Sequence, residues 1–126
     1  MAEENSIYKC ETCGIIVEVI HGGRSMACCG SAMKLLEPKT TTEGVEKHKP
    51  IIELTSSGYK VKIGSIPHPM LAEHHIEWVE LILDDLVLRK NFVVGALPEW
   101  EFCFNGIAKN VSARAYCNIH GLWKSD

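Results

Sequence analysis

The stretch PIIELTSSGYKVKIGS, residues 50–65, has the pattern of a β-hairpin. Two runs of strand-forming residues flank TSSG, which is a typical turn sequence. In the second run, Tyr59, Val61 and Ile63 fall on one face, and the lysines between them fall on the other. The hairpin is therefore predicted to have one apolar and one charged face.

Further strand patterns follow this hairpin along the chain. HIEWVELIL (residues 75–83) is mostly apolar and predicts a central strand, with a turn at the two aspartates that follow. RKNFVV, EWEFCFNG and KNVSARAYC continue the series, at spacings typical of a sandwich or a barrel. No segment shows the 3.6-residue period of an amphipathic helix. The sequence thus predicts a mainly β protein.

The first part of the chain, residues 1–37, differs from the rest in composition. It holds four of the six cysteines and is followed by Pro38 and the polar run KTTTEG, which reads as a linker. A unit this short buries little core and usually needs a metal, disulfides or oligomerisation. We therefore expect a metal-knit domain at residues 1–37 and a β domain at residues 38–126, in which residues 38–49 form the linker and the start of the active-site loop.

Composition restricts the class of protein and its partners. The chain has 126 residues, of which 46% are hydrophobic and 23% charged, as in ordinary globular proteins. No apolar run reaches the roughly 20 residues of a membrane span, and MAEENSIYKC lacks the apolar stretch of a secretory signal. We expect a cytoplasmic protein. The net charge of -3 gives no reason to expect nucleic acid or a membrane as a partner.

The cysteines of the first unit have metal-ligand spacing. Cys10 and Cys13 form a Cys-x-x-Cys turn, whereas Cys28 and Cys29 are adjacent. Adjacent Cα atoms are about 3.8 Å apart, less than the roughly 4.4–6.8 Å of a disulfide, so joint ligation is the better interpretation of the second pair. Four thiolates suit a tetrahedral site for iron or zinc. The spacing leaves the choice of metal open.

A second set of donors lies in loops beside predicted strands. These loops are stiffened by proline or glycine, and they carry His48 (EKHKP), His68 (PHP), His74 and His75 (EHHIEW), and Cys117 and His120 (YCNIHG). Imidazoles and one thiolate suit a middle transition metal, and five ligands leave one octahedral position vacant. We expect the amide N–H groups of Ile119 and His120 to point at the Cys117 sulfur. A lysine beside His48 can attract a small anion to the vacant position.

These motifs resemble a known family. YKCETCG and ACCGSAMKLL resemble the desulforedoxin-like domain, and EKHKP, HPM, HHIEW and YCNIHGLW resemble the iron-centre motifs of desulfoferrodoxin, the two-iron superoxide reductase. The resemblance extends over nearly the whole chain. It implies a small desulforedoxin- or rubredoxin-like domain followed by an immunoglobulin-like β-sandwich, in a homodimer.

The resemblance also implies two iron ions and their ligands. One is a tetrahedral ferric site on Cys10, Cys13, Cys28 and Cys29, and the other is a square-pyramidal ferrous site with His48, His68, His74 and His120 in the plane and Cys117 axial. The implied reaction is the one-electron reduction of superoxide to hydrogen peroxide, with an external donor such as rubredoxin. Lys47 is expected to draw in the anion and order water for proton delivery, and Glu46 to occupy the sixth position after oxidation.

Of the two adjacent histidines His74 and His75, the family spacing selects His74 as the ligand. Ala115 stands where relatives often have an acidic residue, and Leu122 where several have a histidine; neither change removes a ligand. Cys103 matches no ligand position and is expected to be a small core residue.

Two other functions fit the same residues: an electron carrier without a substrate site, and a zinc-ribbon interaction module.

Overall fold

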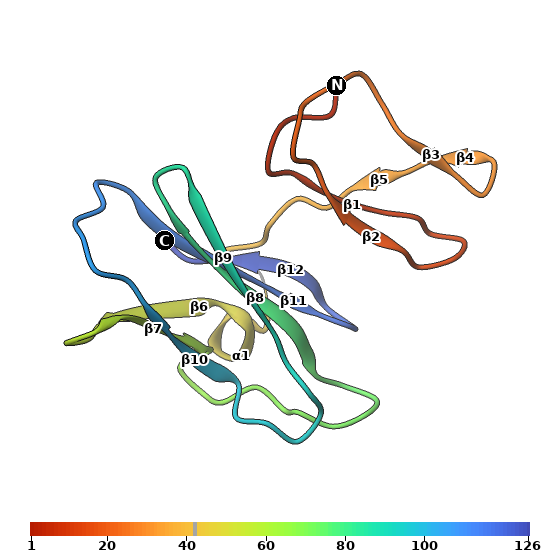
Figure 1. Cartoon of the computed structure of the whole chain (residues 1–126). Helices are drawn as coiled ribbons and strands as arrows, with labels where there is room; N and C mark the ends of the chain where they lie inside the picture. Colours follow the sequence, from red (N-terminus) through yellow and green to blue (C-terminus); the bar gives the residue numbers. More distant parts are fainter. Residues whose placement is uncertain (42) are drawn as a thin grey trace. The chain divides into compact units, whose positions relative to one another are not determined.

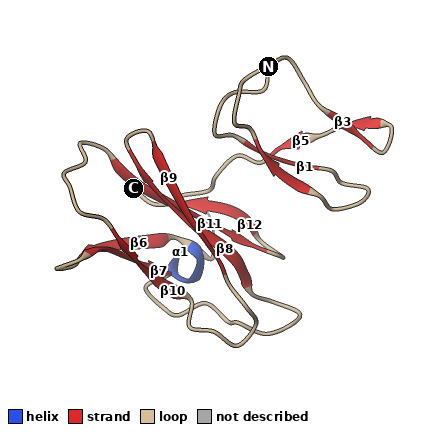
Figure 2. Ribbon diagram, in the orientation of Figure 1, coloured by secondary structure: helices blue, strands red, loops and turns tan. Residues whose placement is uncertain are grey.

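The structure is a computed structural model that describes residues 1–41 and 43–126, and nearly all of its regular structure is β-strand (Figure 2). The prediction of a mainly β protein is therefore confirmed. The chain forms two compact units, Met1–Glu37 and Pro38–Asp126. Every sheet in the described part of the chain lies within one of the two units.

The first unit is built from very short strands (Figure 1). A three-stranded antiparallel sheet has the order β2 (Ile16–Glu18), β1 (Ile7–Lys9), β5 (Lys34–Leu35), and a separate hairpin pairs β3 (Ala27–Cys28) with β4 (Ser31–Ala32). Its buried hydrophobic residues are Ala2, Ile7, Cys10 and Val19. Since so small a core stabilises a fold only weakly, this unit needs a further cross-link, as a metal would provide.

The second unit contains two antiparallel sheets. One has the order β10 (Glu99–Cys103), β7 (Gly58–Ile63), β6 (Pro50–Leu54), and the other has the order β12 (Gly121–Lys124), β11 (Val111–Cys117), β8 (Ile76–Leu83), β9 (Leu86–Asn91). The predicted hairpin is confirmed, because β6 and β7 pair with Leu54 opposite Tyr59. The predicted central strand is also confirmed, because β8 lies between β11 and β9.

The hydrophobic core lies between these two sheets. Val61, Ile63 and Phe102 come from one sheet, and the other contributes the buried residues Val79, Leu81, Leu83, Ala113 and Ala115. Two antiparallel sheets that pack their apolar faces together form a β-sandwich. Tyr59 packs against this core as well, so the face of β7 that was predicted to be apolar is the inner face.

Two features differ from the sequence predictions. A single helical turn, α1 (Val45–His48), precedes β6, and its four residues are too few to show a helical period. The prediction that Cys103 is a core residue is wrong: Cys103 is exposed. Phe102 is buried, and since successive side chains in a strand point to opposite faces, Cys103 points outward. No helix in the described residues has the length and apolar character needed to cross a membrane.

Two candidate metal centres

The four cysteines of the first unit gather at one point. The Sγ atoms of Cys10, Cys13, Cys28 and Cys29, called here the four-cysteine cluster, all lie within 4.8 Å of one another. The Cys13–Cys28 sulfur distance is 3.6 Å and the Cys28–Cys29 distance is 3.8 Å. Sulfurs bound tetrahedrally at about 2.3 Å from a metal ion are themselves about 3.8 Å apart. These two distances match those of a tetrahedral four-thiolate site.

A tight turn places the adjacent cysteines. Cys29 and Gly30 connect β3 to β4, with φ angles of 53° and 78°, as in a two-residue hairpin turn of type I′. This left-handed backbone lets neighbouring residues present both sulfurs to the same point. The Cys13 N–H lies 3.5 Å from the Cys10 sulfur and donates to it, which is the main reason that the pKa of Cys10 falls to about 6.

The crowding of four sulfurs opposes their simultaneous ionisation. The pKa of Cys28 is raised to about 12, first through its hydrogen bond with Cys10 and then through Cys13 and Cys29. Like charges at such distances disfavour each other, whereas a bound cation stabilises every thiolate at once. The four-cysteine cluster thus has the chemistry of a metal site.

The second unit brings the other predicted donors together. The ligand atoms of His48, His74, Cys117 and His120 lie within 4.8 Å of one another. His68 adjoins them, with its Nε2 3.1 Å from the His48 Nε2 and its ring centroid 4.6 Å from that of His74. These five residues, called here the His–Cys cluster, come from α1, the β7–β8 loop, the end of β11 and the β11–β12 turn. Two ligands at right angles to each other, each about 2.1 Å from an ion, are about 3.0 Å apart. The Nε2 of His48 lies 3.1 Å from the ring nitrogens of His68 and His120, close to this spacing.

Backbone carbonyl groups orient two of the imidazoles. The Nδ1–H of His48 donates to the Gly44 oxygen at 2.8 Å, and that of His68 donates to the Pro69 oxygen at 2.7 Å, so each Nε2 points into the cluster. His120 instead presents Nδ1, which is 3.1 Å from the His48 Nε2. The Nε2 of His74 is buried without a hydrogen-bond partner among the described residues. Because a buried unpaired nitrogen is costly, this atom fits the role of a metal ligand.

Burial shifts the pKa values of four of these donors. It lowers the pKa of His48 and His74, and it lowers that of His68 to about 4, so these three imidazoles are neutral at pH 7, as metal binding requires. Cys117 is fully buried, and burial raises the pKa of its thiol. The His120 N–H donates to the Cys117 sulfur at 3.4 Å, and both this group and the Ile119 N–H act in the opposite direction on that pKa. The predicted contact of these amides with the sulfur is confirmed.

Residues that sequence reasoning missed support the His120 turn. The Trp123 ring stacks on His48 with centroids 4.8 Å apart, and its Nε1–H donates to the His120 oxygen at 3.2 Å. The Lys39 ammonium donates to the same oxygen at 2.9 Å. Trp123, two residues after Gly121 in the YCNIHGLW motif, was a weak sequence signal, whereas Lys39 gave none. The turn is therefore tied to both ends of the second unit.

Two family models match the chain. The desulfoferrodoxin model covers residues 40–126, and the model for the desulfoferrodoxin N-terminal domain covers residues 2–36. The chain belongs to the desulfoferrodoxin family. It is 53% identical over 126 residues to a desulfoferrodoxin homolog of Archaeoglobus fulgidus, with 99% of each chain covered. It is 49% identical to the desulfoferrodoxin of Nitratidesulfovibrio vulgaris, over 100% of this chain and 99% of that one.

A solved structure covers this desulfoferrodoxin from end to end. It is the superoxide reductase from Treponema pallidum, with a TM-score of 0.78, 29% sequence identity and 100% coverage of both chains. The family resemblance of the sequence motifs is thus confirmed. The two donor clusters also match the two-iron architecture of desulfoferrodoxin.

The remaining predicted residues of this desulfoferrodoxin lie around the His–Cys cluster. His75 is outside the cluster, and its Nδ1 bonds to the Leu71 oxygen at 3.0 Å. Glu46 and Lys47 are exposed on α1, and the charge of Lys47 contributes, after burial and His120, to the lowered pKa of His74. A Cβ on Gly64 would meet the Glu46 oxygen and the Lys47 carbonyl carbon at 2.7 Å. A glycine at this position therefore allows the β7–β8 loop to lie directly against α1.

The two departures from the family pattern lie in the interior. Ala115 is fully buried in the core of the sandwich, and Leu122 is only 2% exposed. Ala115 pairs with Val79 on one side and with Trp123 on the other. No ligand of the His–Cys cluster is lost through either residue.

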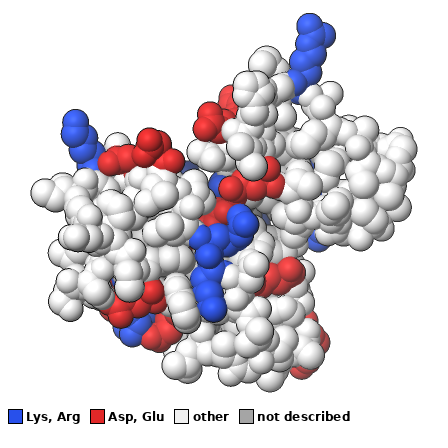
Figure 3. All heavy atoms as spheres, in the orientation of Figure 1, with Lys and Arg blue, Asp and Glu red and all other residues white. Residues whose placement is uncertain are grey.

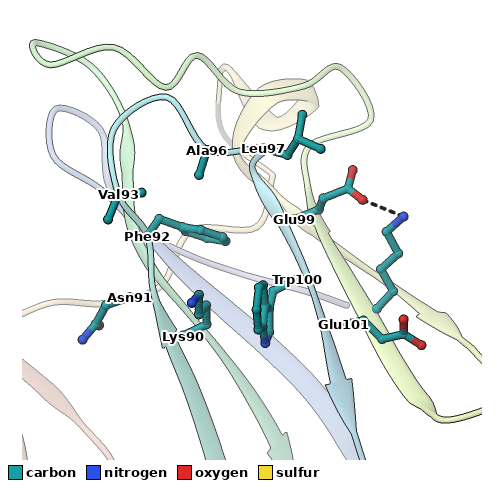
Figure 4. Close-up of a pocket in the computed structure, with 10 residues that line it drawn as sticks. Lys90, Asn91, Phe92, Val93, Ala96, Leu97, Glu99, Trp100 and Glu101 are labelled. Carbon is teal, nitrogen blue, oxygen red and sulfur yellow. Dashed lines mark ion pairs between the residues drawn. The ribbon is translucent and has the colours of Figure 1, made fainter.

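A separate hollow of about 460 Å³ lies beside β10 (Figure 4). Phe92, Leu97 and Trp100 line it, and the Lys90 ammonium lies 4.1 Å from the Trp100 ring centroid. Lys60 and Glu99 form an ion pair at its edge, with a distance of 2.6 Å. None of the residues that line this hollow belongs to either cluster.

On the face of the molecule in Figure 3, acidic and basic side chains lie among each other.

Proposed function

We propose that this desulfoferrodoxin reduces superoxide to hydrogen peroxide at the His–Cys cluster. The observation that carries the proposal is the convergence of one sulfur and four imidazoles, from loops far apart in the chain, with ring nitrogens directed at one point. The whole-length likeness to a solved superoxide reductase supports the same reaction. Each superoxide takes up one electron and two protons to give one hydrogen peroxide.

We propose iron as the metal of both clusters. In the second one, His48, His68, His74 and His120 would provide four nitrogens and Cys117 the fifth ligand, which would leave one position for substrate. A ferrous ion held by these residues would supply the single electron that superoxide accepts. The buried surroundings of Cys117 keep water from its sulfur, and the His120 N–H withdraws part of its electron density.

Lys47 and Glu46 are the residues proposed to handle substrate and protons. Lys47 directly precedes His48 and is exposed, so its ammonium can attract an anion to the cluster although the chain as a whole carries -3. The same ammonium would order the water that delivers protons. The neighbouring carboxylate of Glu46 is proposed to close the open position after oxidation.

The iron of the four-cysteine cluster would hold the first unit together, and it would also be able to pass electrons. We propose an external electron donor such as rubredoxin, a homodimer as the assembly and the cytoplasm as the location, where a reducing environment keeps the clustered cysteines as thiols. Sedimentation of the iron-loaded protein tests the dimer, which requires twice the monomer mass of 14.0 kDa.

The decisive experiment counts the products. Reduced, iron-loaded protein is mixed anaerobically with less than one superoxide per reduced iron of the His–Cys cluster, and the peroxide and oxygen are measured. A reductase gives one peroxide per superoxide and no oxygen. One peroxide per two superoxides, with oxygen released, would indicate dismutation instead. An iron centre that stays reduced, with no more peroxide than superoxide gives without protein, would favour the electron carrier. A colourless protein containing zinc would favour the interaction module.

A further inference from the structure

Asn118 joins the two segments that carry Cys117, His120 and His74. It follows Cys117 directly, and its own N–H donates to the His75 oxygen at 3.2 Å. Its side-chain Oδ1 accepts from the His75 N–H at 2.9 Å, and its Nδ2 donates to the Glu73 oxygen at 3.1 Å. Three hydrogen bonds from one residue therefore hold the backbone on both sides of His74.

His74 depends on this backbone support more than the other histidines of the β7–β8 loop and α1 do. His48 and His68 are each oriented by an Nδ1–H bond to a backbone oxygen. The buried Nε2 of His74 has no partner in the described part of the chain, and the backbone of His74 bonds across a tight turn to Leu71, at 2.9 Å and 3.1 Å. The position of the His74 ring thus follows from where the backbone of residues 73–75 is held.

We propose that Asn118 is a positioning residue, which fixes the backbone around His74 and so holds that imidazole in the His–Cys cluster. The inference rests on the metal centre of the proposed function but does not depend on the reaction catalysed there. An asparagine is well suited to this role because its amide offers one acceptor and one donor at a fixed spacing, and the two neighbouring backbone groups need one of each. Aspartate is nearly isosteric but would set a carboxylate oxygen against the Glu73 oxygen.

A double-mutant cycle separates this role from a general effect on folding. The full-length protein carries Asn118→Ala, His74→Ala, or both, and the affinity of the His–Cys cluster for Fe²⁺ is measured anaerobically by competition with a chelator. We expect Asn118→Ala to weaken binding by about 10- to 100-fold, the usual effect of losing an outer-sphere partner. In the His74→Ala background, the same substitution should change the affinity by less than about twofold.

Two further variants keep the test decisive. Asn110→Ala removes another asparagine that bonds across a turn, to Asp84, and should leave the Fe²⁺ affinity unchanged. If Asn118→Ala fails to fold, Asn118→Asp preserves the shape and one acceptor, and it should still weaken binding. Equal losses with and without the His74→Ala substitution, or wild-type affinity in Asn118→Asp, would overturn the inference. Since iron affinity is read without superoxide, a failure of the proposed reaction would be recognised separately.

Discussion

Gly44 offers a controlled way to move a single imidazole of the His–Cys cluster. It directly precedes α1 with φ +87°, and its oxygen accepts the Nδ1–H of His48 at 2.8 Å. A Cβ at this position would lie 3.3 Å from the His48 Nδ1 and 3.6 Å from its Cε1. Gly44→Ala should therefore cost about 1–2 kcal/mol for the left-handed backbone and should also displace the ring by a few tenths of an ångström.

Gly95 provides the matched control. Its φ is +90°, and a Cβ at this position would have no heavy atom within 4 Å among the described residues, so Gly95→Ala pays a similar backbone cost without touching a ligand. Urea unfolding of the metal-free proteins should show a comparable loss of stability in both variants. Chelator competition for Fe²⁺ should show a loss of about 10- to 100-fold in Gly44→Ala alone. If the two variants bind Fe²⁺ equally well, the Gly44 contact does not position His48 and the reasoning fails.

Three other outcomes follow from the same geometry. Lys47→Ile should slow the reaction with superoxide in pulse radiolysis and weaken the dependence of its rate on ionic strength. Lys109→Ile makes the same change in net charge and should have neither effect. An unchanged rate in Lys47→Ile would contradict the role assigned to Lys47. His74→Ala should bind Fe²⁺ in the His–Cys cluster more weakly and His75→Ala should bind it with unchanged affinity, and chelator competition showing the reverse would exchange their roles. Burial lowers the pKa of His68 from 6.5 to about 4, so below pH 6.5 the unfolded chain takes up a proton that the folded metal-free protein does not. The metal-free protein should therefore lose up to about 3 kcal/mol of unfolding free energy as the pH falls from 6.5 towards 4. Equal urea midpoints at pH 7.5 and pH 4.5 would refute this.

The parts of the fold that local sequence determines could be predicted. The alternation of Tyr59, Val61 and Ile63 with lysines gave the hairpin and its inner face, because side chains of a strand point alternately to its two faces. The same rule explains why the prediction for Cys103 was wrong: since Phe102 lies in the core, its neighbour in the strand points outward. The helical turn that ends at His48 is too short to leave a periodic signal.

The contacts that set the donors' geometry could not be predicted in the same way. Spacing and family resemblance named the five residues of the His–Cys cluster, and the structure brings them together. Nothing in the sequence indicated that Asn118 would reach Glu73 and His75, which are more than forty positions away. Such bonds depend on how the β7–β8 loop and the β11–β12 turn meet, and that is decided by the packing of the whole sandwich.

The visible spectrum of the Cys117→Ser variant tests most directly whether this sulfur and the four imidazoles bind one iron. In the unmodified protein, oxidation should produce a thiolate-to-iron absorption band in addition to the absorption of the four-cysteine iron. The variant should lose the first band and retain the second, because only one of the two sites has lost a sulfur. An unchanged band in Cys117→Ser would show that Cys117 is not an iron ligand and would contradict the proposed centre.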